Sequence, residues 1–196
     1  MIQQQRWVPQ VRAALFAAIT WETAHFIQEL FVNNAAALPA GVTLREADER
    51  DIPAMIEVVN AAFEAEAFFV NRPRTHPAQL AEHFRLGRFL LAHQGAELIA
   101  SVYYELRGER GYIGMLAVRP TEQGCGLGKA MMQAVENTLR ENGCRIAELS
   151  VVSVRTALPP IYRRLGYHET GFAEVPEELL QKLTMPVQLI RMEKSL

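Results

Sequence analysis

Residues 123–129 read Gln123-Gly124-Cys125-Gly126-Leu127-Gly128-Lys129, with three glycines in seven positions. This stretch connects an apolar run typical of a strand, Tyr112–Val118, to a segment typical of a long helix, Leu127–Glu141. Its glycines allow sharp turns and let a ligand approach without meeting a Cβ atom. The first N–H groups of a helix have no partner within it, and the helix dipole adds positive charge there. The stretch therefore predicts an anion site of the kind that holds phosphates.

Two common phosphate-binding motifs do not fit this stretch. A nucleotide P-loop ends in Lys followed by Ser or Thr, whereas Lys129 is followed by Ala130. A dinucleotide fingerprint would require a glycine at position 129, which is the lysine. The pattern that fits is Gln123, two residues, Gly126, one residue and Gly128. The alternative without a ligand is an ordinary strand-to-helix turn that happens to contain several glycines.

This pattern resembles the Arg/Gln-x-x-Gly-x-Gly/Ala signature of the GNAT superfamily of N-acetyltransferases. The segment Met115–Pro120 is similar to the strand that precedes that signature. Downstream, Pro159–Tyr167 resembles the family's second motif, a tyrosine followed by basic residues, Leu-Gly and an aromatic residue. The resemblance extends over residues 42–196. It departs at Arg155, where many members carry Asn, so an Asn-mediated contact to the cofactor arm is not implied here.

The remaining pattern predicts an α/β fold with a mixed, mostly antiparallel twisted sheet. Strands are expected at Val42–Arg45, Arg88–Ala92, Leu98–Leu106, Tyr112–Val118, Ile146–Val152, Tyr167–Phe172 and Leu189–Glu193. Helices are expected at Ile52–Phe63, capped by Asp48 or Asp51, and at Pro77–Leu86, Leu127–Glu141 and Leu158–Leu165. The helix between Tyr112–Val118 and Ile146–Val152 makes a βαβ unit, so these two strands are expected to be parallel at the centre of a GNAT-like acyl-CoA fold.

The first 40 residues are predicted to form a helical extension that precedes an N-acetyltransferase domain at 41–196. Apolar residues recur there at helical spacing, namely Val11, Leu15, Ile19, Phe26 and Leu30. Charged residues interrupt the run, which argues against a signal peptide or a membrane-spanning helix. The extension is expected to pack on its own domain or on a second subunit, which makes a homodimer one expectation.

Composition excludes several classes of function. The formal net charge is −2 and 21% of residues are charged, so no global attraction to nucleic acid or to an anionic membrane is expected. The two cysteines, Cys125 and Cys144, match neither a zinc-ligand spacing nor a disulfide framework, which indicates a reduced, cytoplasmic protein. The histidines form no cluster with ligand spacing, and no metal is expected.

By resemblance, the co-substrate is acetyl-CoA. Its pantetheine arm would pair with the backbone of Leu116–Val118 as if it were an added strand, and its pyrophosphate would lie on the amides from Gly124 to Lys129. The cofactor-binding residues implied in this way are Leu116, Ala117, Val118, Gln123, Gly124, Cys125, Gly126, Leu127, Gly128 and Lys129.

The resemblance also implies two catalytic groups. The N–H of Leu116 would donate to the oxyanion, and Tyr162 would protonate the departing CoA thiolate, because a phenol keeps its proton at neutral pH. The alternative for Tyr162 is a core tyrosine. Three carboxylates are candidate bases acting through water, although each also fits a solvated surface position: Glu105, Glu109 and Glu148.

The acceptor side should be built from the first two helices and the loop between them. Aromatic and acidic residues there predict either a lid with an apolar wall and an acidic rim for a cationic amine, or core packing: Phe63, Glu64, Glu66, Phe68 and Phe69. Arg72 and Arg74 would bind an acceptor carboxylate or a CoA phosphate, unless they are simply solvent-exposed.

The function expected from this reasoning is direct transfer of an acetyl group from acetyl-CoA to a primary amine of a small molecule or a protein. Two alternatives remain open at this point, namely transfer from a longer acyl-CoA and a non-catalytic module that binds acyl-CoA or a partner. The acceptor itself cannot be named, because its pocket is made of loops.

Overall fold

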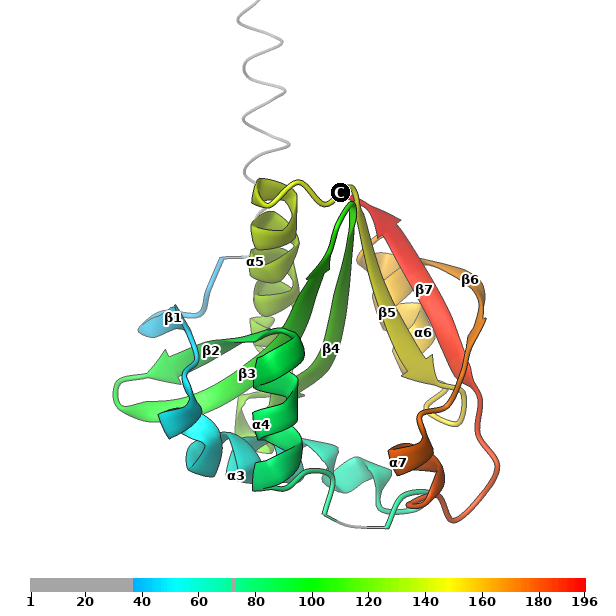
Figure 1. Ribbon diagram of the computed structural model, residues 1–196. Helices are drawn as coiled ribbons and strands as arrows, with labels where there is room; N and C mark the ends of the chain where they lie inside the picture. Colours follow the sequence, from blue (N-terminus) through cyan, green and yellow to red (C-terminus); the bar gives the residue numbers. More distant parts are fainter. Residues whose placement is uncertain (1–36, 72) are drawn as a thin grey trace, which may run out of the picture. The chain divides into compact units, whose positions relative to one another are not determined.

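The computed structural model describes residues 37–71 and 73–196 (Figure 1). The helical extension predicted for residues 1–40 falls almost entirely outside the described residues. The extension and the domain boundary at residue 41 therefore stay predictions.

A single seven-stranded sheet runs through the domain in the order β1-β2-β3-β4-β5-β7-β6. Its strands are β1 (Val42–Glu46), β2 (Arg88–Gln94), β3 (Glu97–Arg107), β4 (Arg110–Val118), β5 (Ile146–Val152), β6 (His168–Ala173) and β7 (Leu189–Ser195). Every neighbouring pair is antiparallel except β4 and β5, which are parallel. The predicted mixed sheet with one parallel βαβ unit is confirmed.

The helices are α3 (Ile52–Ala62), α4 (Pro77–Leu86), α5 (Leu127–Glu141), α6 (Leu158–Arg164) and α7 (Glu177–Leu180), with short 3-10 turns η1 (Glu49–Asp51), η2 (Phe63–Glu66) and η3 (Pro120–Glu122). Both α4 and α5 have the predicted bounds. The sequence did not predict α7, η2 or η3, because three or four residues are too few to show a helical period. Within residues 37–71 and 73–196, no helix is long and apolar enough to cross a membrane.

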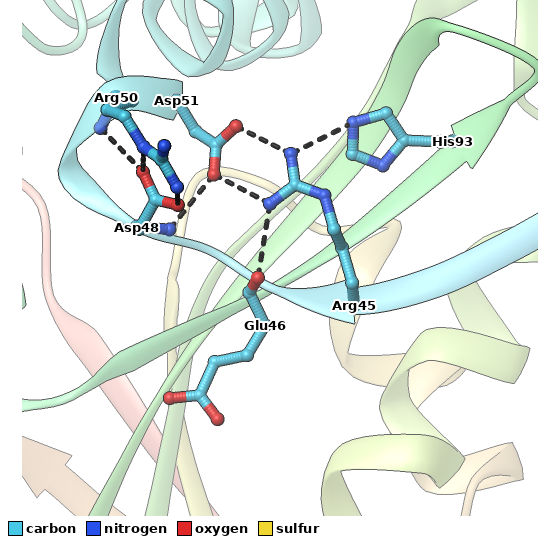
Figure 2. A network of polar contacts seen from close by, with 6 residues as sticks. All are labelled: Arg45, Glu46, Asp48, Arg50, Asp51 and His93. Atoms are coloured by element: carbon cyan, nitrogen blue, oxygen red, sulfur yellow. Dashed lines mark hydrogen bonds and ion pairs between the residues drawn. The ribbon is translucent and has the colours of Figure 1, made fainter.

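The two candidate caps act together where the chain enters α3 (Figure 2). The Asp48 carboxylate accepts a hydrogen bond from the Arg50 amide, and the Asp51 carboxylate accepts one from the Asp48 amide. This capping box starts η1, which continues into α3. The Arg45 side chain on β1 donates two hydrogen bonds, of 2.7 and 2.6 Å, to the Asp51 carboxylate, and this contact lowers the pKa of Asp51. The start of α3 is therefore fixed to the edge strand.

Helices cover both faces of the sheet, and each face has its own apolar core. On one face, α5 and α6 pack over β3, β4 and β5, with Met131, Val135 and Leu139 completely buried. On the other face, α3 and α4 pack over β2, β3 and β4, and their core includes Met55 and Phe89. We call these two sides the α5 face and the α3 face.

The parallel pair in the centre is short. β4 and β5 share three register pairs, from Arg110 opposite Ile146 to Tyr112 opposite Glu148, and the strands then part (Figure 1). At the paired end, Glu148 accepts hydrogen bonds from Arg107 and Arg110. The sheet thus consists of two halves that meet at one end and diverge toward the other.

The helix α5 connects the two halves. It packs over β2, β3 and β4, and its buried Glu136 reaches the second half. The Tyr167 hydroxyl donates to Glu136 at 2.9 Å, and the Lys194 ammonium donates to the other carboxylate oxygen at 2.6 Å. Because the strands themselves pair over so few residues, these contacts help to fix the angle between the halves.

Replacing Lys194 with Met should lower the free energy of unfolding by about 2 kcal/mol, because it leaves the buried Glu136 carboxylate without its cation. Urea unfolding followed by circular dichroism measures this. The control is Arg145→Met, which removes an exposed ion pair to Glu109 and should change the same free energy by less than about 1 kcal/mol. Equal effects in the two variants would contradict the role assigned to Glu136.

Candidate active site

A groove of about 940 Å³ opens where β4 and β5 part. Its walls come from β4, the loop before α5, the end of β5, α6 and the segments around η2, α4 and α7. Eight of the predicted site residues line it: Leu116, Val118, Gln123, Gly124, Gly126, Gly128, Lys129 and Tyr162. Residues separated by up to 46 positions in the chain therefore share one cavity, as the resemblance implied.

The glycine loop needs its glycines for its backbone conformation. Gly124 and Gly126 have φ angles of 84° and 88°, in the left-handed region that disfavours other residues. A Cβ atom at either position would meet nothing within 4 Å, so it would project into open space. Gly126 directly precedes α5, and no side chain caps this helix among the described residues. The first amides of α5 are thus left for another acceptor.

The third glycine lies inside the first turn of α5. A Cβ at Gly128 would stand 3.7 Å from Val118 and 3.8 Å from Leu116, which is ordinary contact. Packing within the protein therefore does not require a glycine at position 128. Gly128 lines the groove, so its missing side chain leaves room for a ligand. Gln123 holds the loop to the strand, because its side-chain amide donates to the Val118 carbonyl at 3.0 Å.

Three of the predicted residues do not line the groove. Ala117 and Leu127 are buried at 0% and 1% exposure, and Cys125 is exposed while its thiol contacts the Glu122 carbonyl. Their predicted contacts to a cofactor involve only backbone atoms and stay predictions.

A bulge in β4 sets the direction of Leu116. Tyr103 pairs with Gly114 and Ser101 with Ala117, so two residues of β4 lie opposite one residue of β3. At the bulge Met115 has a φ of 46°, an unusual value for a residue with a side chain. As a result Met115 packs on the α3 face, whereas Leu116 packs on the α5 face. Bulges often re-aim side chains next to active sites, but nothing in the sequence of this strand indicated one.

Tyr162 lies on α6 and packs against the core of the α5 face. Its ring meets the ring of Tyr167 edge-on at 6.0 Å, and no described residue hydrogen-bonds its hydroxyl. Burial raises the pKa of Tyr162, and Tyr112 raises it further, while Arg155 acts in the opposite direction. The phenol is therefore protonated at neutral pH and is available as a donor in the groove.

Sequence reasoning missed Tyr112 and Gly114, which line the groove from β4. A Cβ at Gly114 would come within 2.9 Å of the Tyr112 ring and 3.1 Å of its hydroxyl oxygen, so only glycine lets this ring lie along the strand. The sequence contained one signal for this arrangement: Gly114 follows Tyr112 by two residues, so the two lie on the same face of the strand.

The three candidate bases lie outside the groove. Glu105 accepts hydrogen bonds from the Tyr103 hydroxyl and from Arg107. Glu148 is held by arginines at the paired end of β4 and β5, and Glu109 is an exposed hairpin residue 3.7 Å from Arg145. The structure therefore does not bring these carboxylates to the groove.

The predicted acceptor side is only partly present at the groove. Phe63 and Glu66 line it, whereas Phe69 is fully buried in the core and Phe68 is 54% exposed. Glu64 is exposed and lies outside the lining residues. The prediction of an acidic rim is therefore not supported.

The charged residues that do reach this part of the groove are mostly basic. Glu66 is 7% exposed and forms ion pairs with Arg155 at 3.4 Å and Arg74 at 3.9 Å. Lys182 lines the groove as well, and Arg72 lies outside the described residues. Arg155, noted in the sequence only as a departure from the family pattern, thus joins the segment after β5 to η2.

Comparison with known proteins adds independent information. A model of the Acetyltransferase (GNAT) family matches residues 53–167. The mycothiol acetyltransferase of Actinosynnema mirum is 33% identical over 137 residues, which cover 66% of this chain and 46% of that protein. The chain thus spans about half the length of this curated relative.

Solved structures share the fold. The ribosomal-protein-S18-alanine N-acetyltransferase from Escherichia coli superposes with a TM-score of 0.63 at 18% identity, over 79% of this chain and 93% of that one. A putative acetyltransferase from Salmonella typhimurium, solved with its cofactor acetyl-CoA, gives a TM-score of 0.61 at 19% identity, over 79% and 94% of the two chains. At these identities the likeness concerns the fold.

Raising the pH above 10 should destabilise the protein, because the pKa of each of its five tyrosines is raised above the ordinary value: Tyr103, Tyr104, Tyr112, Tyr162 and Tyr167. Above about pH 10 the unfolded chain releases phenolic protons that the folded chain retains, so the free energy of unfolding falls as pH rises. Urea unfolding between pH 8 and 11 measures this, and Tyr162→Phe should reduce the slope. Tyrosinate absorbance that appears in the folded protein with a midpoint near 10 for all five would contradict it.

Proposed function

The chain belongs to the Acetyltransferase (GNAT) family, and from this membership we propose that it transfers an acetyl group from acetyl-CoA to a primary amine of a small molecule or a protein. One observation carries the proposal: the glycine loop at the start of α5 opens into the same groove as Leu116 and Tyr162. The loop proposed to bind an anion, the free edge of β4 at Leu116 and the phenol of Tyr162, a candidate proton donor, thus line one cavity.

Acetyl-CoA would be held by the loop and by β4. Its pyrophosphate would lie on the amides from Gly124 to Lys129, where the helix dipole favours negative charge. Its pantetheine arm would follow Leu116–Val118, because β5 has left this side of β4 and no longer pairs with it. Both contacts use backbone groups, which explains why the loop is rich in glycine.

The reaction would be direct transfer. The neutral amine attacks the thioester carbonyl, a C–N bond forms, the C–S bond breaks, and the proton of the amine passes to solvent. The N–H of Leu116 is the proposed donor to the oxyanion, a contribution of roughly 3 kcal/mol for a single donor of this kind. Tyr162, whose raised pKa keeps it protonated at neutral pH, would give its proton to the departing thiolate and regain one from solvent, which has received the proton of the amine.

Two further features belong to the same proposal. A reduced, cytoplasmic setting is supported by the two free thiols, of which Cys144 is buried and Cys125 is exposed. A homodimer formed through residues 1–40 is supported by the apolar residues at helical spacing in that segment.

Replacing Gly126 with Val should weaken CoA binding at least roughly tenfold, because the side chain would project into the groove and disturb the amides of α5. Isothermal titration calorimetry with CoA measures the Kd. The matched control is Gly95→Val in the turn between β2 and β3, where φ is 60° and a Cβ also meets nothing within 4 Å. Both variants should lose similar stability, and an equal Kd for CoA in the two would refute the pyrophosphate site.

Replacing Tyr162 with Phe should lower kcat about a hundredfold and leave the Kd for CoA unchanged, because the phenol would act on the leaving group and not on binding. CoA thiol release with a panel of primary amines measures this. The control is Tyr104→Phe, which removes the hydroxyl of another buried tyrosine that does not line the groove. Binding of acetyl-CoA without turnover of any amine would instead favour a non-catalytic acyl-CoA-binding module.

A further inference from the structure

The part of the groove between η2, α4 and α7 carries more positive than negative charge. We call it the acceptor end and define it by six lining residues: Phe63, Glu66, Arg74, His83, Arg155 and Lys182. Two arginines and a lysine stand there against a single carboxylate. A site that received only a cationic amine would need the opposite balance, because like charges repel.

The one carboxylate of the acceptor end is already engaged. Glu66 is nearly buried, and it pairs with Arg155 at 3.4 Å and with Arg74 at 3.9 Å. It therefore offers little attraction to a second cation such as an ammonium group. Its evident role is to hold the two arginines beside the groove.

The hydrogen-bond donors of Arg74 remain available, although its side chain forms an ion pair with Glu66. A guanidinium group has five N–H donors, and those of Arg74 make no hydrogen bond to any described residue. Its Nε atom is buried and lies 3.9 Å from a Glu66 carboxylate oxygen, too far for a hydrogen bond, although buried polar groups are nearly always hydrogen-bonded. The guanidinium lies 4.9 Å from the centre of the Phe63 ring, and this stacking fixes its plane. A planar donor group that lines a groove and makes no hydrogen bond to the described residues indicates a planar anionic ligand.

The anion bound there is not a phosphate of CoA in the proposed arrangement. Phe63, on which Arg74 stacks, packs with Tyr112 in the core of the α3 face. Leu116, Val118 and Tyr162 pack instead on the α5 face, where the glycine loop begins α5. The sheet separates the two sets except at the gap between β4 and β5, so Arg74 lies on the side opposite the pyrophosphate loop.

We propose that the acceptor is a small amine that also carries a carboxylate, as an amino acid does, and that Arg74 binds this carboxylate with its two-pronged donor fork. This inference rests on the proposed acetyl transfer. Paired N–H···O contacts to a carboxylate are among the strongest and most directional in proteins. Lys182, whose ammonium group donates to the neutral Gln79 side chain at 3.3 Å and forms no ion pair within residues 37–71 and 73–196, adds charge that attracts the same group.

The same cations also assist the reaction of the amine. Positive charges nearby disfavour the ammonium form and so lower the pKa of a bound amine. A larger fraction is then neutral and able to attack the thioester. The acceptor end would thus select the carboxylate and prepare the nucleophile with the same residues.

The test compares free L-amino acids with their carboxamides and with 1,4-diaminobutane as acceptors in the CoA thiol-release assay. The wild-type protein should show a kcat/KM for its best amino acid roughly tenfold to a hundredfold above that for the matching carboxamide, the range expected for a charged hydrogen bond. In Arg74→Gln this ratio should fall to about one, while the KM for acetyl-CoA stays unchanged. Arg74→Lys, which keeps the charge but not the fork, should give an intermediate ratio.

The control variant is Arg85→Gln, which removes the same charge from an exposed residue of α4 outside the groove and should keep the wild-type ratio. A carboxamide or 1,4-diaminobutane used as well as the amino acids, or an unchanged ratio in Arg74→Gln, would overturn this inference and leave the acetyl transfer standing. Calorimetric binding of acetyl-CoA with no turnover of any of these amines would overturn this inference, and no turnover of peptide amines either would overturn the acetyl transfer as well.

Discussion

The site exists because β4 and β5 stop pairing soon after they begin. These two strands share only three register pairs, and beyond Tyr112 and Glu148 the centre of the sheet is open. Exposed backbone groups along a strand need partners, and a site that supplies an extended ligand with those partners gains both affinity and alignment. The opening is stable because other contacts take over the role of the missing pairs. Arginines hold Glu148 at the paired end, and Glu136 of α5 binds Lys194 of the second half.

The same opening explains why the groove has two chemically different ends. The proposed anion site at the start of α5 and the phenol of Tyr162 lie on the α5 face. The stacked pair of Phe63 and Arg74 lies on the α3 face. A sheet is normally a barrier between its two faces, so two substrates bound on opposite sides meet only where strands have parted. Direct transfer requires such a meeting point, because no covalent intermediate on the protein carries the acetyl group between two places.

The features predicted from the sequence were those with local causes. The bounds of α5 follow from the glycines before it and from Asn142-Gly143 after it, and β5 follows from an apolar run bounded by polar residues. The features that were missed depend on distant contacts. Arg155 and Glu66 are 89 positions apart in the chain, and no local pattern indicates that they pair. The positive φ of Met115 likewise arises from the register of β4 on β3 and not from a residue type that favours it.

The acidic rim was one of two expectations for the acceptor side, and the contacts of Glu66 do not support it. Glu64 and Glu66 look like a site for a cation when they are seen alone, but the fold brings Arg74 and Arg155 to Glu66 from two other segments. The charge that a substrate meets depends on every segment that lines the groove, and for the described lining residues of the acceptor end the sum is positive. The positive charge also matters for the question of a general base. The three carboxylates considered as bases all lie outside the groove: Glu105, Glu109 and Glu148. A nearby free carboxylate would stabilise the ammonium form of an amine, whereas fixed cations stabilise the neutral form that attacks. In the proposed reaction, therefore, the protein has less need of a base because it binds the acceptor among cations.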